Sequence, residues 1–227
     1  MGRTRGYNGD DFGNYDDLTK KPATHLKGKN KMSRFSAIAV LSLCAAVPVL
    51  AGANELHSGR YEELMLAVTP EHQVEGYYSQ EMGEGVTRSC TFYLQGKPEA
   101  LTTWLDDAYP GSVSASSDGV TLTVEQGRQH PGCISVLMPE IATGLELTQT
   151  ASEQWIGLVT VAADKAYLLK KPGADTAKRP YIVKGDVVGV LAFKDGWAQV
   201  EFTNAKDRSF KGWISEDQYT RVSAPKR

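Results

Sequence analysis

Apolar and polar positions alternate with a period of two through much of the chain after residue 54, which is the pattern of half-buried strands. Four runs in the first half show it, or are rich in Val, Thr, Tyr and Phe: residues 61–68, 73–79, 90–94 and 120–124. Residues 98–108 fit a short helix or a further strand. Asp118-Gly119 predicts a hairpin, because glycine tolerates a positive φ. The pattern predicts a mainly β chain with an antiparallel β-barrel or β-sandwich domain over residues 54–154.

A domain boundary is predicted near residues 150–154, beyond which the strands are shorter and more closely spaced. The expected strands are residues 158–162, 166–169, 181–183, 187–193, 198–202, 212–214 and 220–222. Lys184-Gly185-Asp186 and Lys194-Asp195-Gly196 predict tight turns between them. Such a series indicates a small barrel or sandwich over residues 155–227.

Several short motifs follow one another in this second part. They are Tyr167-Leu168 with Pro172, residues 183–188 (Val-Lys-Gly-Asp-Val-Val), residues 195–200 (Asp-Gly-Trp-Ala-Gln-Val), Lys211-Gly212-Trp213-Ile214, and Tyr219. In this order they resemble a bacterial SH3-like (SH3b) domain, over about 70 residues. One departure is Tyr167-Leu168-Leu169, where the family commonly has Asn-Val-Arg, so a ligand contact through that triplet is not carried over. Residues 54–150 resemble no family that we recognise.

The resemblance implies a small SH3-like β-barrel that recognises peptidoglycan peptides or an envelope protein acting on them. Barrels of this kind use exposed aromatic side chains as a recognition floor, and nearby cations favour a carboxylate-bearing ligand. The expected ligand-binding residues are Tyr167, Tyr181, Trp213, Tyr219, Arg179 and Lys184, with Lys170 close by. Trp197 follows a tight turn and is expected in the core.

The start of the chain has the layout of a signal peptide. Residues 1–31 are too polar to bury a core, which predicts a disordered or misassigned extension, with translation starting at Met32. A basic stretch, an apolar run over residues 35–50 and Ala51-Gly52-Ala53 then predict a signal peptide over residues 32–53. Leu43 before Cys44 is too large for a lipoprotein signal. We therefore expect a periplasmic or secreted protein with no stable membrane span after cleavage.

Two cysteines remain beyond the signal peptide, Cys90 and Cys133. An even number in an exported protein predicts a disulfide, worth about 4 kcal/mol by the chain-entropy estimate. The alternative is a catalytic thiol assisted by His130, but a free thiolate is hard to keep in an oxidising compartment. His130-Pro131-Gly132 is therefore interpreted as a turn that delivers Cys133 to Cys90.

Charge is divided along the predicted boundary. Residues 54–154 hold four basic and fifteen acidic side chains, net −11, and residues 155–227 hold thirteen basic and eight acidic ones, net +5. Opposite charges predict that the two parts attract each other. Export and the acidic first part argue against nucleic acid as a partner.

No motif of a hydrolase, a zinc site or a phosphate-binding loop is present in the sequence. We therefore expect no enzyme, no cofactor and no metal. The predicted function is a periplasmic, non-catalytic binding or adaptor protein, and the alternative is an inhibitor or immunity-type protein that neutralises a secreted toxin or enzyme. An enzyme centred on His130, or on Glu81 and Glu84, is the remaining alternative.

Overall fold

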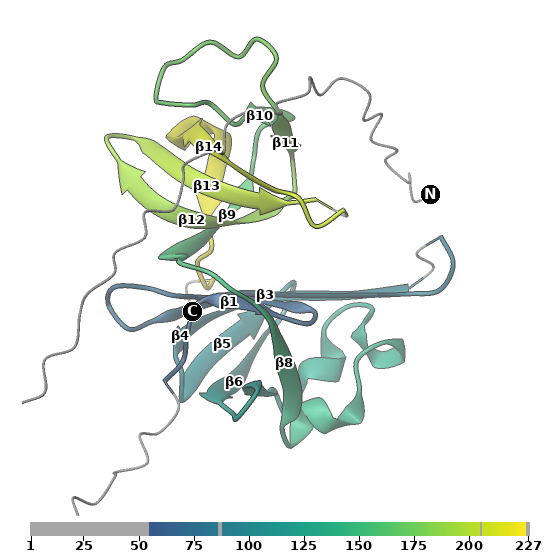
Figure 1. Cartoon of the computed structure of the whole chain (residues 1–227). Helices are drawn as coiled ribbons and strands as arrows, with labels where there is room; N and C mark the ends of the chain where they lie inside the picture. Colours follow the sequence, from purple (N-terminus) through teal and green to yellow (C-terminus); the bar gives the residue numbers. More distant parts are fainter. Residues whose placement is uncertain (1–54, 86–87, 205, 226–227) are drawn as a thin grey trace, which may run out of the picture. The chain divides into compact units, whose positions relative to one another are not determined.

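The computed structural model describes residues 55–85, 88–204 and 206–225, which all belong to one compact unit. The predictions for residues 1–31 and 32–53 lie outside these described residues. The chain is mainly β, as predicted, with a closed antiparallel barrel of eight strands followed by two further sheets (Figure 1).

The first part is a barrel in which each strand pairs with the next and the last pairs with the first. Its strands are β1 (Gly59–Tyr61), β2 (Leu64–Val68), β3 (Val74–Met82), β4 (Arg88–Lys97), β5 (Ala100–Trp104), β6 (Ala108–Ala115), β7 (Gly119–Thr123) and β8 (Leu145–Ser152). Alternate side chains fill the interior, among them Leu66, Phe92, Leu94 and Leu122, all fully buried. Closure of the barrel leaves none of these strands as an open edge.

Two details of the barrel differ from the sequence predictions, and one open alternative is decided. Residues 61–68 are not one strand, because a turn with Glu62 at φ 51° separates β1 from β2. Of the two alternatives for residues 98–108 the strand is confirmed, since Leu101 and Thr103 alternate into the interior from β5. The hairpin at Gly119 forms without a positive φ there. A Cβ on Gly119 would lie 2.0 Å from the carbonyl oxygen of Leu147, so the close approach of β8 excludes a side chain.

Three short 3₁₀ helices connect β7 to β8: η1 (Gly127–Gln129), η2 (Cys133–Ser135) and η3 (Pro139–Ala142). The predicted disulfide between Cys90 and Cys133 is confirmed, and it ties η2 to β4. Gly132 before η2 has φ 79°, and a Cβ there would lie 2.3 Å from the carbonyl oxygen of Ser89. Glycine is therefore required in the turn that delivers Cys133.

The last third contains a five-stranded sheet of order β14-β13-β12-β9-β15 and a two-stranded sheet, β10-β11. The elements are β9 (Gly157–Val161), β10 (Lys165–Tyr167), β11 (Tyr181–Val183), β12 (Val187–Lys194), β13 (Trp197–Thr203), β14 (Ser209–Ser215), η4 (Glu216–Gln218) and β15 (Tyr219–Arg221). Every strand predicted from the sequence in this part is present. Asp195 and Gly196 both have positive φ, which gives the hairpin turn between β12 and β13 the twist that antiparallel strands favour.

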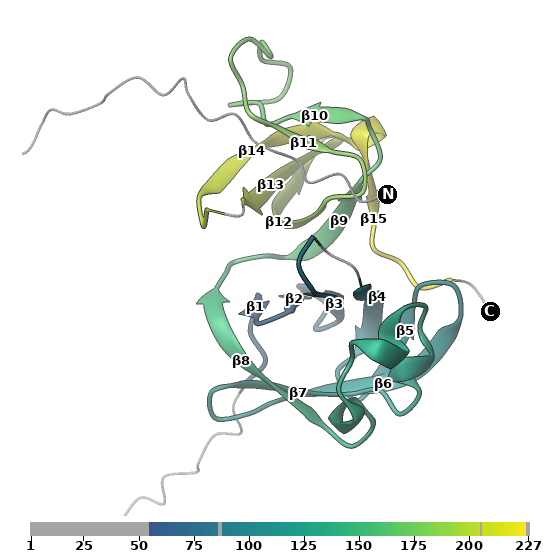
Figure 2. The ribbon, with the colours of Figure 1, turned by 90° about the vertical axis from the view of Figure 1, so that its right-hand side faces the viewer.

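The junction between the barrel and the five-stranded sheet is apolar at its centre. Trp155, only 2% exposed, packs there with Ala67, Leu158 and Val222, and a Cβ on Gly189 would lie 2.2 Å from the Trp155 ring. Hydrogen bonds surround this cluster, and β9 lies beside β2 and β3 (Figure 2). The contact therefore buries apolar surface, and the attraction between the opposite charges of the two parts stays a prediction.

Candidate functional site

Two tyrosines predicted to bind ligand lie side by side on the two-stranded sheet. Tyr167 and Tyr181 are cross-strand partners, with ring centroids 5.7 Å apart and planes inclined by 64°. Both side chains are half-buried. Lys165 Nζ lies 4.8 Å from the centroid of the Tyr181 ring, within the range of a cation–π contact. The pair thus presents aromatic surface next to a cation.

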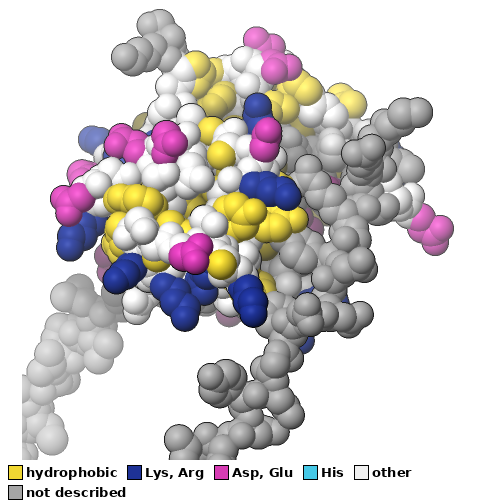
Figure 3. Space-filling view, turned by 90° about the horizontal axis from the view of Figure 1, so that it is seen from above, with side chains coloured by type: hydrophobic (Ala, Val, Ile, Leu, Met, Phe, Trp, Pro, Cys, Tyr) yellow, Lys and Arg dark blue, Asp and Glu magenta, His cyan; other side chains and the backbone are white. Residues whose placement is uncertain are grey.

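We call the surface carried by β10, β11 and the loop between them the basic aromatic face. Its residues 162–186 include six basic side chains and three acidic ones: Lys165, Lys170, Lys171, Lys178, Arg179 and Lys184 against Asp164, Asp175 and Asp186. On the side seen in Figure 3, Lys and Arg side chains border patches of hydrophobic side chains. The five lysines are exposed, so this face is open to an anionic ligand.

The other predicted residues near this face have different positions. Arg179 donates from Nε to the carbonyl oxygen of Leu168 at 2.7 Å, so it anchors the base of the loop. Lys184 lies exposed in the turn after β11. Trp213 on β14 forms an isolated bridge with Leu169, and its side chain is half-buried between the buried neighbours Gly212 and Ile214. Tyr167 and Tyr181 are therefore the two predicted aromatic residues that direct contact brings together.

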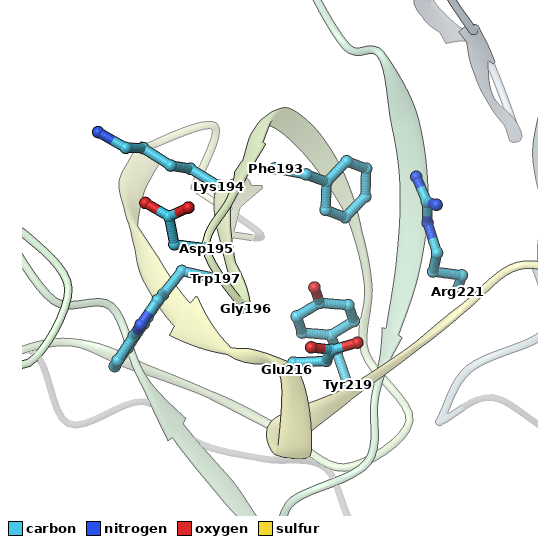
Figure 4. Close-up of a pocket in the computed structure, with 8 residues that line it drawn as sticks. All are labelled: Phe193, Lys194, Asp195, Gly196, Trp197, Glu216, Tyr219 and Arg221. Atoms are coloured by element: carbon cyan, nitrogen blue, oxygen red, sulfur yellow. The ribbon is translucent and has the colours of Figure 1, made fainter.

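Tyr219 belongs to a separate hollow of about 380 Å³ at the end of the β12–β13 hairpin (Figure 4). The hollow is lined by Phe193, Lys194, Asp195, Gly196, Trp197, Glu216, Tyr219 and Arg221. The rings of Phe193 and Tyr219 have centroids 6.3 Å apart. Of the six residues predicted to bind ligand, this lining contains Tyr219 alone.

Both signs of charge line the hollow. The guanidinium carbon of Arg221 lies 4.0 Å from the Phe193 ring centroid, and Glu216 lies beside Tyr219 in Figure 4. Burial raises the pKa of the Tyr219 phenol, the Glu216 carboxylate raises it further and Arg221 lowers it. Tyr219 therefore stays a neutral hydrogen-bond donor at physiological pH. Such a lining suits a ligand that carries an ammonium and a carboxylate on an apolar frame.

Sequence reasoning placed Trp197 in the core, but its side chain is half-buried and lines the hollow. Trp197 and Gln199 are two residues apart on β13, so their side chains share one face of the strand. The buried Ala198 and Val200 are on the other face. Phe193, Glu216 and Arg221 were not anticipated as site residues. The turn predicted at Lys194-Asp195-Gly196 was the sequence signal available for this hollow, because it indicates where the hairpin ends. No local pattern predicts that residue 193 lies near residue 221.

The His130 region is a packed interior. His130 is 1% exposed and stacks on Phe92 with ring centroids 4.7 Å apart, while Tyr109 contacts it edge-on. Its Nε2 lies 3.0 Å from Thr103 Oγ1, and its Nδ1 has no hydrogen-bond partner among the described residues. Burial lowers the pKa of His130 to about 4, against a smaller opposing effect of Asp107. Cys133 is oxidised, so the two residues form no thiolate–imidazole pair in this state.

Glu81 and Glu84 are exposed at the β3–β4 hairpin. Within the described ranges no three His, Cys, Asp or Glu side chains are grouped as metal ligands, and no helix is long and apolar enough to cross a membrane. Comparison of the chain with protein-family models, curated proteins and solved structures finds no match.

Proposed function

We propose that this chain is an exported, non-catalytic binding protein whose last third, an SH3-like module, recognises a carboxylate-bearing peptide of the cell wall. The observation that carries the proposal is the Tyr167–Tyr181 pair with Lys165 over one ring. Flat aromatic side chains offer contact area at low entropic cost, and the exposed lysines around them attract carboxylates.

The hollow at Tyr219 adds a second contact region of complementary chemistry. Cell-wall stem peptides carry free amino groups as well as carboxylates. Glu216 and the rings of Phe193 and Tyr219 suit an ammonium group, and Arg221 suits a carboxylate. A peptide with both groups should therefore bind this module more tightly than a simple anion of equal charge.

Export is supported by the disulfide, because such bonds persist in oxidising compartments. Both of its cysteines are fully buried in the barrel core. The barrel thus supplies a cross-linked support for the module, joined to it through the cluster around Trp155.

Co-sedimentation of the purified protein with isolated sacculi tests the proposal. We expect retention at low salt and release as salt rises. K170Q/K184Q removes two exposed cations from the basic aromatic face and should reduce retention about three- to tenfold. K97Q/K206Q removes two exposed lysines elsewhere and is the matched control. Absence of retention at low salt, or equal retention of the two double variants, would overturn the proposal.

A further inference from the structure

One end of the barrel gathers exposed apolar side chains. Among the described residues, the large hydrophobic side chains that are most exposed are Met82 (40%), Leu105 (36%), Ile134 (68%) and Met138 (52%). They come from the β3–β4 hairpin, the β5–β6 loop and the segment of short helices between β7 and β8. Isolated exposed apolar residues are ordinary, but four at the same end of a barrel make that end suited to contact with another protein.

The disulfide and the strand register place these segments at the same end of the barrel. The Cys90–Cys133 disulfide holds η2 against the start of β4, next to the β3–β4 hairpin. The charge of Asp107 in the β5–β6 loop acts on His130, just before η2. The antiparallel register places Trp104 at the end of β5 opposite Tyr93 of β4, so the β5–β6 loop follows at the same end as the hairpin.

This end is also strongly acidic. Its exposed carboxylates are Glu81, Glu84, Asp106, Asp107, Glu125 and Glu140, against the two cations Arg88 and Arg128, which leaves a net charge of −4. We call this surface the acidic end. Its combination of apolar and anionic side chains fits a partner surface with exposed aromatic or apolar groups among cations.

The basic aromatic face of the same chain has that chemistry. Its half-buried tyrosines lie among six basic and three acidic side chains, a net charge of +3. The junction with the barrel is made mainly through β9, Trp155 and Val222, which belong to neither surface. Both surfaces are therefore open in a single copy.

We infer that the acidic end of one copy docks on the basic aromatic face of a second copy. Two different surfaces meet in such a head-to-tail contact, so each copy keeps one free surface and association continues beyond the dimer unless a ring closes. The association depends on no cell-wall ligand, so it goes beyond the proposed function. It also covers Tyr167 and Tyr181, which makes assembly and ligand binding on this face mutually exclusive.

Sedimentation velocity of the full chain tests this inference. In 50 mM salt the native mass should rise with concentration beyond that of a dimer, and the apparent dissociation constant should increase about tenfold or more in 500 mM salt. I134S/M138S at the acidic end and K170E/K184E on the basic aromatic face should each be monomeric. K97Q/K206Q should associate like the native chain.

Mixing the two monomeric variants is the decisive step. I134S/M138S keeps its basic aromatic face and K170E/K184E keeps its acidic end, so a 1:1 mixture should form dimers that grow no further. Circular dichroism spectra identical to that of the native chain confirm that both variants are folded. A native chain that is monomeric at every concentration, or a mixture that stays monomeric, overturns the inference. Sacculus retention by I134S/M138S, measured separately, reports on the proposed function alone.

Discussion

The carboxylate of Glu75 on the barrel accepts the backbone N–H of Leu158 on the five-stranded sheet, across 2.7 Å. Glu75 is 8% exposed, and its Oε2 would lie 2.9 Å from a Cβ on Gly157. Burial raises the pKa of Glu75, while the Leu158 hydrogen bond and the charge of Arg221 lower it. The start of β9 is therefore held in place by Glu75, a buried acid of the barrel.

Glu75→Ala should cost about 1–3 kcal/mol of unfolding free energy, because it leaves the Leu158 N–H buried without its acceptor. Glu75→Gln keeps an oxygen acceptor and should cost less. Because the pKa of Glu75 is raised in the fold, ionisation destabilises the native state as pH increases above the ordinary value of 4.5. In urea titrations, the unfolding free energy of the native chain should therefore fall relative to that of Glu75→Gln between pH 4 and pH 7. A shift in the opposite direction would contradict this assignment.

The disulfide should contribute about 4 kcal/mol to the stability of the barrel, since it closes a loop with a sequence separation of 43. Replacing both cysteines by alanine should lower the urea midpoint accordingly. Both sulfurs are buried, so dithiothreitol should reduce the native protein only as fast as it opens. Rapid reduction of the folded protein would show that the bond is accessible.

Gly132→Ala should be more destabilising than Gly173→Ala. Both glycines have positive φ, at 79° and 69°, so each substitution costs about 1 kcal/mol for the backbone conformation. Only at Gly132 does the new Cβ meet backbone, 2.3 Å from the Ser89 oxygen, because nothing lies within 4 Å at Gly173. Thermal unfolding of the two variants, with thiol quantification, measures the difference. Equal losses would show that the turn before Cys133 relaxes freely.

Acid should destabilise the barrel through His130. Its pKa in the fold is about 4 against 6.5 ordinarily, so the folded state binds the proton less well than the unfolded state. The stability from neutral His130 is complete above pH 6.5 and is lost as pH falls toward 4, by roughly 3 kcal/mol in total. His130→Gln should remove that part of the pH dependence in urea titrations from pH 7.5 to 4. Parallel curves for the two proteins would contradict the assigned pKa.

The strands of the last third could be predicted because short alternating runs end at glycine turns such as Gly185 and Gly196, both at positive φ. The barrel was harder to predict. Strand β6 contains Pro110 and few large apolar residues, and β8 alternates only through Leu145 and Leu147. Strand β8 pairs with β1 and β7, which lie far from it along the chain, and local patterns do not contain such partners. Strand β6 pairs with its sequence neighbours β5 and β7, but it has too few large apolar residues to show an alternation.

The candidate site was predicted only where partners are close in sequence. Tyr167 and Tyr181 flank one loop and were both expected among the ligand-binding aromatics, and the structure adds that they are cross-strand partners. Trp197 was assigned to the core because a tryptophan after a turn is commonly buried, but strand alternation puts it on the outer side. The inhibitor or immunity-type alternative rests on the acidic, disulfide-linked barrel and stays a prediction.

The most direct test of the central claim, that the last third is a recognition module, is NMR titration of the ¹⁵N-labelled protein with a soluble stem peptide bearing free amino and carboxylate groups. We expect shifts confined to residues 165–184 and to the hollow around Tyr219 and Arg221, with binding about three- to tenfold weaker in K170Q/K184Q. Shifts confined to the barrel, or none at millimolar peptide, would contradict the claim.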